Sequence, residues 1–338
     1  AIPTTARIGV LIEENSSPTI GALRQRVGQR FENLKWVPYN SIGENAQEVG
    51  YATAFGRAVR PQFNFSQARV VVSLDADFLA ATDVNFVRNT REFAEGRSVD
   101  DHTPLRHYAF EPTYSTTGGM ADHRARVKPS EVASVAAALA NRLGVGGAPA
   151  AAAPSGAVAR LVDAAAADLR SAGAAGVVVA GDAQPAEVHA ICAAINSMLG
   201  AVGNVLTLFD TADVEIARRE AVEDLIDDVK AGRTDVLVMI GVNPAYDLAG
   251  DGDLLSALER LDSTIHVGQH VDETAALSSW HVPQTHYLES WGDGRSYDGT
   301  LSVVQPLIAP LYPECKSAIE VLSALAMDGG TTGYDQVL

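Results

Sequence analysis

A short apolar run, Val236–Ile240, leads directly into Gly241, Asn243 and Pro244. Five β-prone residues that break at a Gly and an Asn-Pro pair are typical of a buried parallel strand with a turn at its carboxyl end. In open α/β sheets, ligands bind at the carboxyl ends of the strands. This stretch therefore predicts a parallel sheet with a candidate ligand site at its edge.

The same order of segments occurs twice, around residues 69–131 and again around 236–289. Each copy has a strand, a broken turn, a helix, a second strand, a Thr-containing loop and a segment that reaches a proline. We interpret this as an internal pseudo-repeat of one α/β unit. Strands alternating with helices predict doubly wound parallel sheets with right-handed crossovers, so the fold class is two Rossmann-like α/β domains related by the pseudo-repeat.

The length of 338 residues suits two domains rather than one. An Ala-, Gly- and Pro-rich segment at 146–156 has the composition of a linker. The predicted organisation is therefore a first domain at 1–145, the linker, a second domain at 157–326 and a C-terminal tail at 327–338.

Two local signals predict where helices begin. Ser17 before Pro18 is typical of an N-cap followed by a proline in the first turn. Ser130 is predicted to cap the helix that runs to Leu143.

Composition excludes several classes of partner. A formal net charge of −17 argues against nucleic acid and anionic lipid, because phosphates need basic partners. No stretch approaches the roughly 20 apolar residues of a membrane span, so we expect no direct membrane span. No signal peptide is visible. Two cysteines, Cys192 and Cys315, cannot supply a four-thiolate cluster or a structural zinc site, and Cys192 is predicted to be a small buried hydrophobe.

The candidate cofactor-binding residues all follow predicted strands. Small residues and backbone amides there would let a dinucleotide approach, with carboxylates on ribose or guanine. The alternative is that every parallel sheet needs Gly, Asp and Asn to turn at its strand ends, so a site here is either functional or vestigial. The candidates are Asp75, Asp77, Gly181, Asp182, Gly241, Asn243 and Pro244.

Other chemistry has no positive signal in the sequence. Neither Gly-x-Gly-x-x-Gly nor a P-loop motif is present, and no catalytic residue or metal ligand is predicted. The histidines are interpreted as hydrogen-bonded residues and not metal ligands; they include His107, His266, His270, His281 and His286.

The second copy of the repeat resembles the molybdopterin oxidoreductase family of the dimethyl sulfoxide reductase type. In that family a strand ends in Gly-x-Asn-Pro, an acidic-Thr-Ala segment follows, and an apolar-Pro segment leads to a Glu. Here these places are taken by 241–244, 272–275 and 282–289. The sequence of residues 285–291 (Thr-His-Tyr-Leu-Glu-Ser-Trp) resembles one branch of the family more closely. This branch is the molybdopterin-enzyme-like half of the iron–sulfur subunit of bacterial alternative complex III, a quinol-oxidising respiratory complex.

The first copy of the repeat matches the same family more loosely. Glu111-Pro112, then Thr116 to Gly118, then Ala121-Asp122 stand where the family has Asp-Pro, Thr-x-Thr-Ala and Ala-Asp. The resemblance thus covers nearly the whole chain, although each motif alone is weak.

The resemblance implies a non-catalytic structural module of a respiratory iron–sulfur oxidoreductase subunit. It implies no cofactor in this chain and iron–sulfur clusters only in the rest of the full-length protein. The implied partners are that iron–sulfur domain, a membrane quinol-oxidising subunit and cytochrome subunits, on the periplasmic face of the cytoplasmic membrane.

Two alternatives stay open. The chain could be the cofactor-cradling part of a working molybdopterin oxidoreductase, which would hold molybdopterin guanine dinucleotide. It could also be an independent nucleotide-binding protein, for which we expect a thermal shift with guanine nucleotides.

Overall fold

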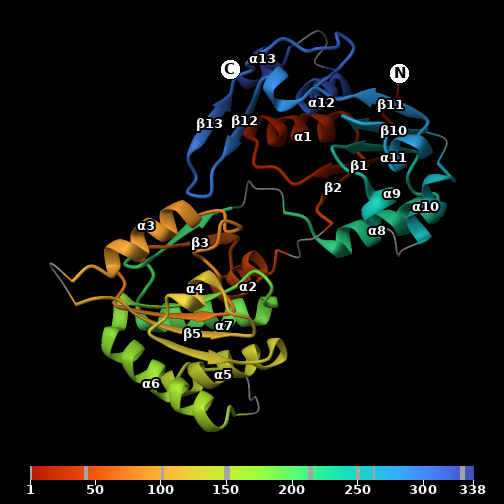
Figure 1. Cartoon of the computed structure of the whole chain (residues 1–338). Coiled ribbons are helices and arrows are strands. Elements are labelled where there is room, and N and C mark those ends of the chain that lie inside the picture. Colours follow the sequence, from red (N-terminus) through yellow and green to blue (C-terminus); the bar gives the residue numbers. More distant parts are fainter. Residues whose placement is uncertain are drawn as a thin grey trace. The chain divides into compact units, whose positions relative to one another are not determined.

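The chain folds into two compact units (Figure 1). The computed structural model describes residues 2–41, 45–99, 103–147, 153–211, 216–248, 252–261, 263–327 and 332–338. Unit 1 comprises residues 1–44 and 213–338, and unit 2 comprises residues 45–212.

Unit 1 is built on a five-stranded parallel sheet. Its strand order is β11-β10-β9-β1-β2, and β1 pairs on one side with β2 and on the other with β9. The chain therefore reverses its direction of strand addition between β1 and β9, which makes this position the topological switch point of the sheet. The strands are β1 (Ile8–Glu13), β2 (Leu34–Tyr39), β9 (Val236–Ile240), β10 (Ser263–Gly268) and β11 (Trp280–Pro283).

Helices cover both faces of the unit 1 sheet. On one face, α1 (Pro18–Arg30) and α12 (Ala318–Ala326) bury Leu23 and Leu322 against alternate residues of β1 and β9. On the other, α8 (Arg219–Lys230) and α10 (Gly252–Leu258) pack on the remaining residues, such as Leu237 and Met239. The other elements are α9 (Pro244–Asp247), α11 (Glu273–Leu277), η3 (Tyr287–Glu289), β12 (Gly292–Arg295), β13 (Leu301–Val304) and α13 (Gly333–Val337).

Unit 2 contains a four-stranded parallel sheet in the order β6-β5-β4-β7. Strands β4 and β7 are buried along their whole length, as expected of a sheet with helices on both faces. A separate antiparallel pair joins β3 (Val59–Phe63) to β8 (Leu206–Asp210). The sheet strands are β4 (Val70–Leu74), β5 (Arg106–Glu111), β6 (His123–Arg126) and β7 (Gly176–Ala180).

The unit 2 sheet also lies between two apolar clusters. Side chains of α5, α6 and α7 pack with Val72, Phe110 and Val178 on one face. Tyr51 of α2 and Phe93 of α3 belong to the cluster on the other. The helices of this unit are α2 (Ala46–Phe55), α3 (Phe86–Gly96), α4 (Thr116–Gly119), η1 (Pro129–Glu131), α5 (Val132–Leu143), α6 (Gly156–Ala172), η2 (Gly173–Ala175) and α7 (Ala186–Leu199).

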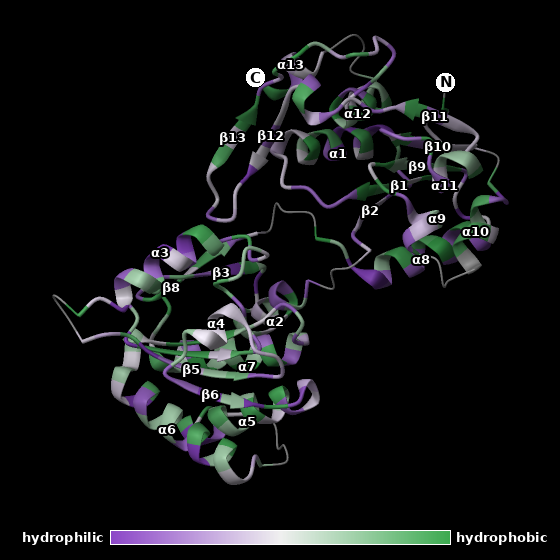
Figure 2. Ribbon diagram, viewed as in Figure 1, coloured by the Kyte–Doolittle hydropathy of each residue, from purple (hydrophilic) through white to green (hydrophobic). Residues whose placement is uncertain are grey.

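The structure confirms the predicted fold class. Both sheets are parallel and carry helices, and hydrophobic residues are concentrated in the central strands (Figure 2). Strands β4, β5 and β6 follow one another outward from a central strand, as β9, β10 and β11 do in unit 1. The pseudo-repeat is therefore visible in the strand order.

The compact units divide the chain differently from the predicted boundaries. Ile8 of β1 pairs with Val236 of β9, and Val70 of β4 pairs with Gly176 of β7, so each sheet joins strands from both sides of the predicted linker. Unit 2 is inserted between the second and third strands of unit 1. Residues 148–152 of the linker lie outside the described residues, and α6 begins within its last residues. The predicted tail contains α13.

Across the ranges that the structure describes, none of the helices combines the length and apolar character needed to traverse a bilayer.

The two cysteines differ in environment, and this predicts a difference in reactivity. Cys192 lies in α7 and is 1% exposed, as the sequence predicts, whereas Cys315 is partly exposed. Burial raises the pKa of the Cys192 thiol to about 12, and the thiolate is the reactive form. We expect iodoacetamide at pH 8 to modify Cys315 and to spare Cys192 in the native protein, as measured by peptide mass spectrometry.

Urea provides the control for this labelling, since both thiols should react once the chain is unfolded. Modification of the two cysteines at similar rates in the native protein would contradict the burial of Cys192.

Candidate functional site

The carboxyl ends of the central strands define a candidate site in each unit. In unit 2 the chain leaves β4 at Asp75 and leaves the neighbouring strand β7 at Gly181. In unit 1 the chain leaves β9 at Gly241, next to Glu13 at the end of β1. Both positions lie where the strand order reverses, which is the usual ligand crevice of an open α/β sheet.

A threonine locks the turn after β4 in unit 2. Asp75 begins this turn in the left-handed region, with φ 54°. The Asp77 Oδ1 accepts a hydrogen bond from the Thr117 N–H at 2.8 Å, and Thr117 Oγ1 accepts one from the Leu79 N–H at 2.9 Å. Thr117 is fully buried, so these bonds satisfy groups that water does not reach.

The turn after β9 in unit 1 repeats this construction. Gly241 begins it with φ 68°. Asn243 Oδ1 accepts from the Thr274 N–H at 3.2 Å, and Thr274 Oγ1 accepts from the Ala245 N–H at 3.0 Å. Asn243 Nδ2 also donates to Glu273 at 2.8 Å. The internal repeat therefore extends to individual hydrogen bonds.

The predicted candidates fall into two groups. Four of them, Asp75, Asp77, Gly181 and Asp182, lie in unit 2, and the remaining three, Gly241, Asn243 and Pro244, lie in unit 1. The side chains of Asp77 and Asn243 form the hydrogen bonds of the two turns. Pro244 occupies the first position of α9, and Asp182 is exposed.

In unit 2 the chain itself fills the switch point. A Cβ added to Gly181 would lie 1.8 Å from the carbonyl oxygen of Asp75, so the two strand-end loops touch. The Asp75 carboxylate accepts a hydrogen bond from Gln184 Nε2 at 2.8 Å. Burial raises the pKa of Asp75, which the Gln184 bond opposes and the charge of Glu111 reinforces.

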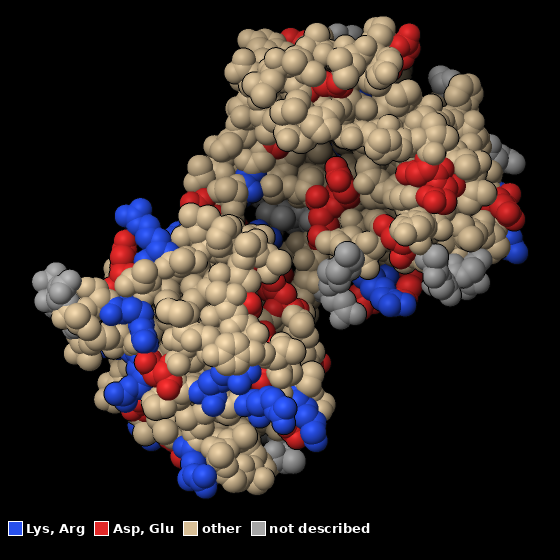
Figure 3. Space-filling model, in the orientation of Figure 1, with Lys and Arg blue, Asp and Glu red and all other residues tan. Residues whose placement is uncertain are grey.

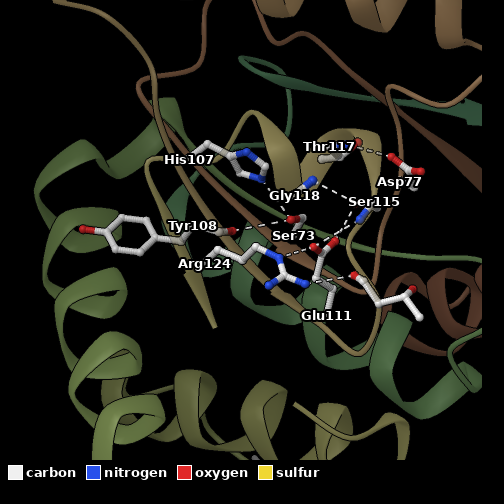
Figure 4. A network of polar contacts seen from close by, with 10 residues as sticks. Ser73, Asp77, His107, Tyr108, Glu111, Ser115, Thr117, Gly118 and Arg124 are labelled. Atoms are coloured by element: carbon white, nitrogen blue, oxygen red, sulfur yellow. Dashed lines mark hydrogen bonds and ion pairs between the residues drawn. The ribbon is translucent and has the colours of Figure 1, made fainter. Parts of the chain in front are cut away.

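A buried carboxylate at the end of β5 organises the next loop (Figure 4). Glu111 is 4% exposed and is paired with Arg124 of β6. Ser115 Oγ donates to Glu111 and accepts from the Gly118 N–H at 2.8 Å. A Cβ on Gly118 would lie 1.8 Å from Glu111 Oε1. With these neighbours, Glu111 holds the loop of residues 112–119 against the sheet.

Sequence reasoning missed this ion pair. The sequence singles out Glu111 only through its place in a weak motif, and it gives no role to Arg124 at the end of the same loop. The available signal was an acidic residue at a strand end with an arginine in the next strand, which is too common a pattern to single out.

His107 lies in the core of unit 2 beside Ser73 (Figure 4). Its Nε2 lies 2.9 Å from Ser73 Oγ, and its ring is flanked by Phe78 and Phe93. Its Nδ1 has no hydrogen-bond partner within the described part of the chain. Burial lowers the pKa of His107 to about 4, an effect that the nearby Asp122 charge partly opposes.

This shifted histidine predicts acid sensitivity of unit 2. The unfolded chain binds a proton at His107 near pH 6.5, and the folded chain binds it only near pH 4. The contribution of neutral His107 to the free energy of unfolding is therefore complete above pH 6.5 and is lost as the pH falls from 6.5 to 4. The loss from this pKa difference is up to about 3 kcal/mol. Urea unfolding at several pH values should show a flatter pH dependence for His107→Gln.

His123→Gln is the matched control, because His123 is exposed on β6. The free energy of unfolding of His123→Gln should change with pH as that of the parent protein does. Part of the slope should survive in His107→Gln, since burial also lowers the pKa of His189. Identical slopes in all three proteins would contradict the assignment.

Unit 1, in contrast, has open space at its switch point. One cavity of about 230 Å³ lies at the β9 turn, and a second of about 430 Å³ extends toward β12 and α12. The two share Glu13, Gln269 and Gln284. The first also contacts Gly241, Val242, Asn243, His266, Gly268, His270 and Asp272.

Two histidines beside the smaller cavity are bonded to each other. His266 Nε2 lies 3.2 Å from the Val242 carbonyl oxygen, and His266 Nδ1 lies 3.0 Å from His281 Nδ1. A carbonyl only accepts, so Nε2 carries the proton of neutral His266, and His281 donates to its Nδ1. Burial lowers the pKa of His266, which favours this neutral form.

This arrangement makes the two histidines hydrogen-bonded parts of the sheet. Within the described ranges, no group of three or more His, Cys, Asp or Glu side chains is placed to hold a metal ion.

The residues present do not fit a molybdopterin guanine dinucleotide. Its pyrophosphate would need cations or free backbone N–H groups. The described lining of the unit 1 cavities includes Glu13, Asp272 and Asp293 but no Lys or Arg. The N–H groups of Ala245 and Thr274 are already bonded within the turn.

Comparison with known proteins reveals similarity of fold and not of sequence. No family model matches the chain, and no curated protein matches its sequence. Acetylene hydratase from Pelobacter acetylenicus superposes with a TM-score of 0.67 over 94% of this chain at 12% identity. The match covers 55% of that chain, so the present chain spans about half the length of acetylene hydratase.

A second structure is also similar. The formyltransferase/hydrolase complex (FhcABCD) from Methylorubrum extorquens, solved with methylofuran, gives a TM-score of 0.57 at 14% identity. This match covers 96% of the present chain and 91% of that one. Together with the two parallel sheets, these likenesses show that the chain shares the α/β fold of the matched part of acetylene hydratase.

Proposed function

We propose that this chain is a non-catalytic, molybdopterin-oxidoreductase-like structural module of a respiratory iron–sulfur subunit. The observation that carries the proposal is the state of the two switch points. In unit 2, Gly181 and Asp75 close the crevice, and in unit 1 the described residues that line it include carboxylates but no Lys or Arg. An anionic dinucleotide would find no room in the crevice of unit 2, and the carboxylates of unit 1 would repel it.

The proposal extends to the complex in which the module acts. The resemblance of 285–291 to alternative complex III supports a place beside the iron–sulfur domain of the same full-length chain, on the periplasmic face. A quinol-oxidising membrane subunit and cytochrome subunits would complete the assembly. Exposed apolar residues suit a scaffold that binds partners, and they gather on and after β13; they are Leu301, Val303, Leu307, Ile308, Leu311 and Tyr312.

The test is the molybdenum, tungsten and pterin content of the full-length subunit produced in a cofactor-competent host. We expect neither metal and no pterin, with iron from the clusters present as evidence of correct assembly. A known molybdenum enzyme made in the same host controls for cofactor supply. Stoichiometric metal and pterin would overturn the proposal and establish the alternative, a working molybdopterin oxidoreductase.

A further inference from the structure

One pair of histidines joins the edge strand of the unit 1 sheet to its neighbour. His266 of β10 and His281 of β11 are partners in the parallel register, and their Nδ1 atoms lie 3.0 Å apart. Strand β11 has four residues and lies at the edge of the sheet. The hydrogen bond between the two rings therefore adds to a short backbone ladder.

The ring of His266 is held in one orientation. It is 1% exposed, and its Nε2 donates to the Val242 carbonyl oxygen at 3.2 Å. A Cβ on Gly268 would lie 2.5 Å from Cε1 of this ring, so the imidazole lies against the glycine. The Nδ1 atom of His266 is thereby directed at His281, from which it accepts a hydrogen bond.

This hydrogen-bond pattern tolerates a proton on one histidine but not on the other. A proton on the second nitrogen of His281 leaves the bond intact, because its Nδ1 still donates. A proton on His266 can enter only at Nδ1, because its Nε2 already carries one. Two N–H groups would then point at each other, and two charged rings with centres 5.2 Å apart would repel. Protonation of His266 is therefore incompatible with the contact between the strands.

A carboxylate beside His266 stabilises its protonated form. Asp272 caps α11 by accepting from the Ala275 N–H at 2.8 Å, and its Oδ2 lies 3.6 Å from His266 Nε2. Burial lowers the pKa of His266, whereas the charge of Asp272 opposes this shift and that of His281 reinforces it. On the face drawn in Figure 3, acidic side chains predominate over basic ones on unit 1, which also favours uptake of a proton. Other charged or titratable groups on the surrounding elements include Glu13, His270, Glu273 and Lys316.

We propose that this pair is a pH-sensitive switch that releases β11 from β10 when His266 binds a proton. In neutral solution His266 accepts from His281, and β11 is attached. In acid His266 becomes a cation paired with Asp272, and its new N–H displaces His281. Because β11 leads into residues 284–291 on the wall of the larger cavity, its release loosens that wall. The switch adds regulation to unit 1 and does not depend on the structural role proposed above.

The direction of the pH effect follows from the burial of His266. While β11 is attached, the pKa of His266 is lower than its ordinary value of 6.5, and release of the strand lets it return toward that value. Attachment is therefore complete above pH 6.5 and weakens as the pH falls below it. Opening that takes up one proton becomes more favourable by up to about tenfold per pH unit.

Hydrogen exchange of the intact chain measures this release. The protection factor of peptides that cover β11 should fall about tenfold between pH 7 and pH 5, after correction for the pH dependence of intrinsic exchange. Peptides of β9, in the centre of the same sheet, should keep their protection, which separates local release from unfolding of unit 1. An unchanged protection factor of β11, or an equal loss in β9, would overturn the proposal.

Two variants identify the titrating group. His266→Gln supplies an amide that donates and accepts without titrating, so β11 protection should become nearly equal at pH 7 and pH 5. Asp272→Asn keeps an N-cap residue but removes the charge that favours protonated His266, so the loss should move to lower pH by about one unit. His270→Gln is the control, because His270 is an exposed histidine on the same cavity as His266. It should keep the pH dependence of the parent protein.

The thermal midpoint of each variant at pH 7 shows whether it is folded, and the shift in Asp272→Asn decides if His266→Gln is not. A full loss of β11 protection in folded His266→Gln, no loss in His270→Gln, or an unshifted loss in Asp272→Asn would each contradict the switch. Metal and pterin content tests the structural role separately, so the two proposals can fail independently.

Discussion

Gly181→Ala is expected to lower the free energy of unfolding of unit 2 by about 4 kcal/mol, a large effect for one methyl group. The new Cβ would lie 1.8 Å from the Asp75 carbonyl oxygen and 2.7 Å from its carbon. These are backbone atoms, held by the pairing of β4 with β7 and by the left-handed turn at Asp75. No side chain can rotate away, so one strand-end loop must move.

Unit 2 needs its own probe, because all three tryptophans, Trp36, Trp280 and Trp291, lie in unit 1. Tryptophan fluorescence during urea unfolding therefore reports unit 1, and hydrogen exchange of β4 and β7 peptides reports unit 2. The control is Gly146→Ala, whose Cβ would meet nothing within 4 Å. Equal protection of β4 and β7 in the two variants would contradict the close approach.

Local features of the fold could be predicted from the sequence because they depend on neighbouring residues. Ser17 accepts a hydrogen bond from the Ile20 N–H at 3.1 Å, as its position before Pro18 predicts. The prediction for Ser130 was wrong. It lies inside η1, where Glu131 accepts from the Lys128 N–H at 3.0 Å, and α5 begins only at Val132. The backbone N–H at the start of this segment is therefore bonded by the Glu131 carboxylate and not by the Ser130 hydroxyl.

The order of strands could not be predicted, since an apolar run indicates burial and not its neighbour in the sheet. Ile8 and Val236 pair across an inserted unit. No periodicity in either strand encodes that partnership. The segment at 146–156 has the composition of a linker, but composition does not show which strands such a segment separates.

The candidate site shows the same limit. The residue types at the strand ends followed from the turns they must make. Their hydrogen-bond partners could not be predicted, because these lie far along the chain. Asp77 bonds Thr117, 40 residues later, and Asn243 bonds Thr274, 31 residues later. Because these two spacings differ by nine residues, a search for a fixed spacing would not find the hydrogen bonds that the two turns share.

Arg124→Met is expected to destabilise unit 2 by about 3 kcal/mol, because it leaves a buried carboxylate without its counter-charge. The side chain of Glu111 is 5% exposed and that of Arg124 is 23% exposed, so water cannot replace the guanidinium fully. Methionine keeps an apolar stem but loses the cation over the Tyr114 ring, which lies 4.6 Å from the guanidinium carbon. Hydrogen exchange of β5 and β6 peptides in urea measures the loss.

Arg126→Met is a closely matched control, since Arg126 lies on the same strand with an exposed side chain. It should change stability by no more than about 0.5 kcal/mol. Equal effects of the two substitutions would contradict the pairing.

The double variant Glu111→Gln, Arg124→Met separates charge from shape. A neutral amide at position 111 no longer needs a cation, so the double variant should regain more than half of the stability lost in Arg124→Met. That recovery would show that the pair fixes the loop of residues 112–119 and is not a source of net stability. Glu111 would then be a structural carboxylate at a strand end, which agrees with a fold retained as a scaffold.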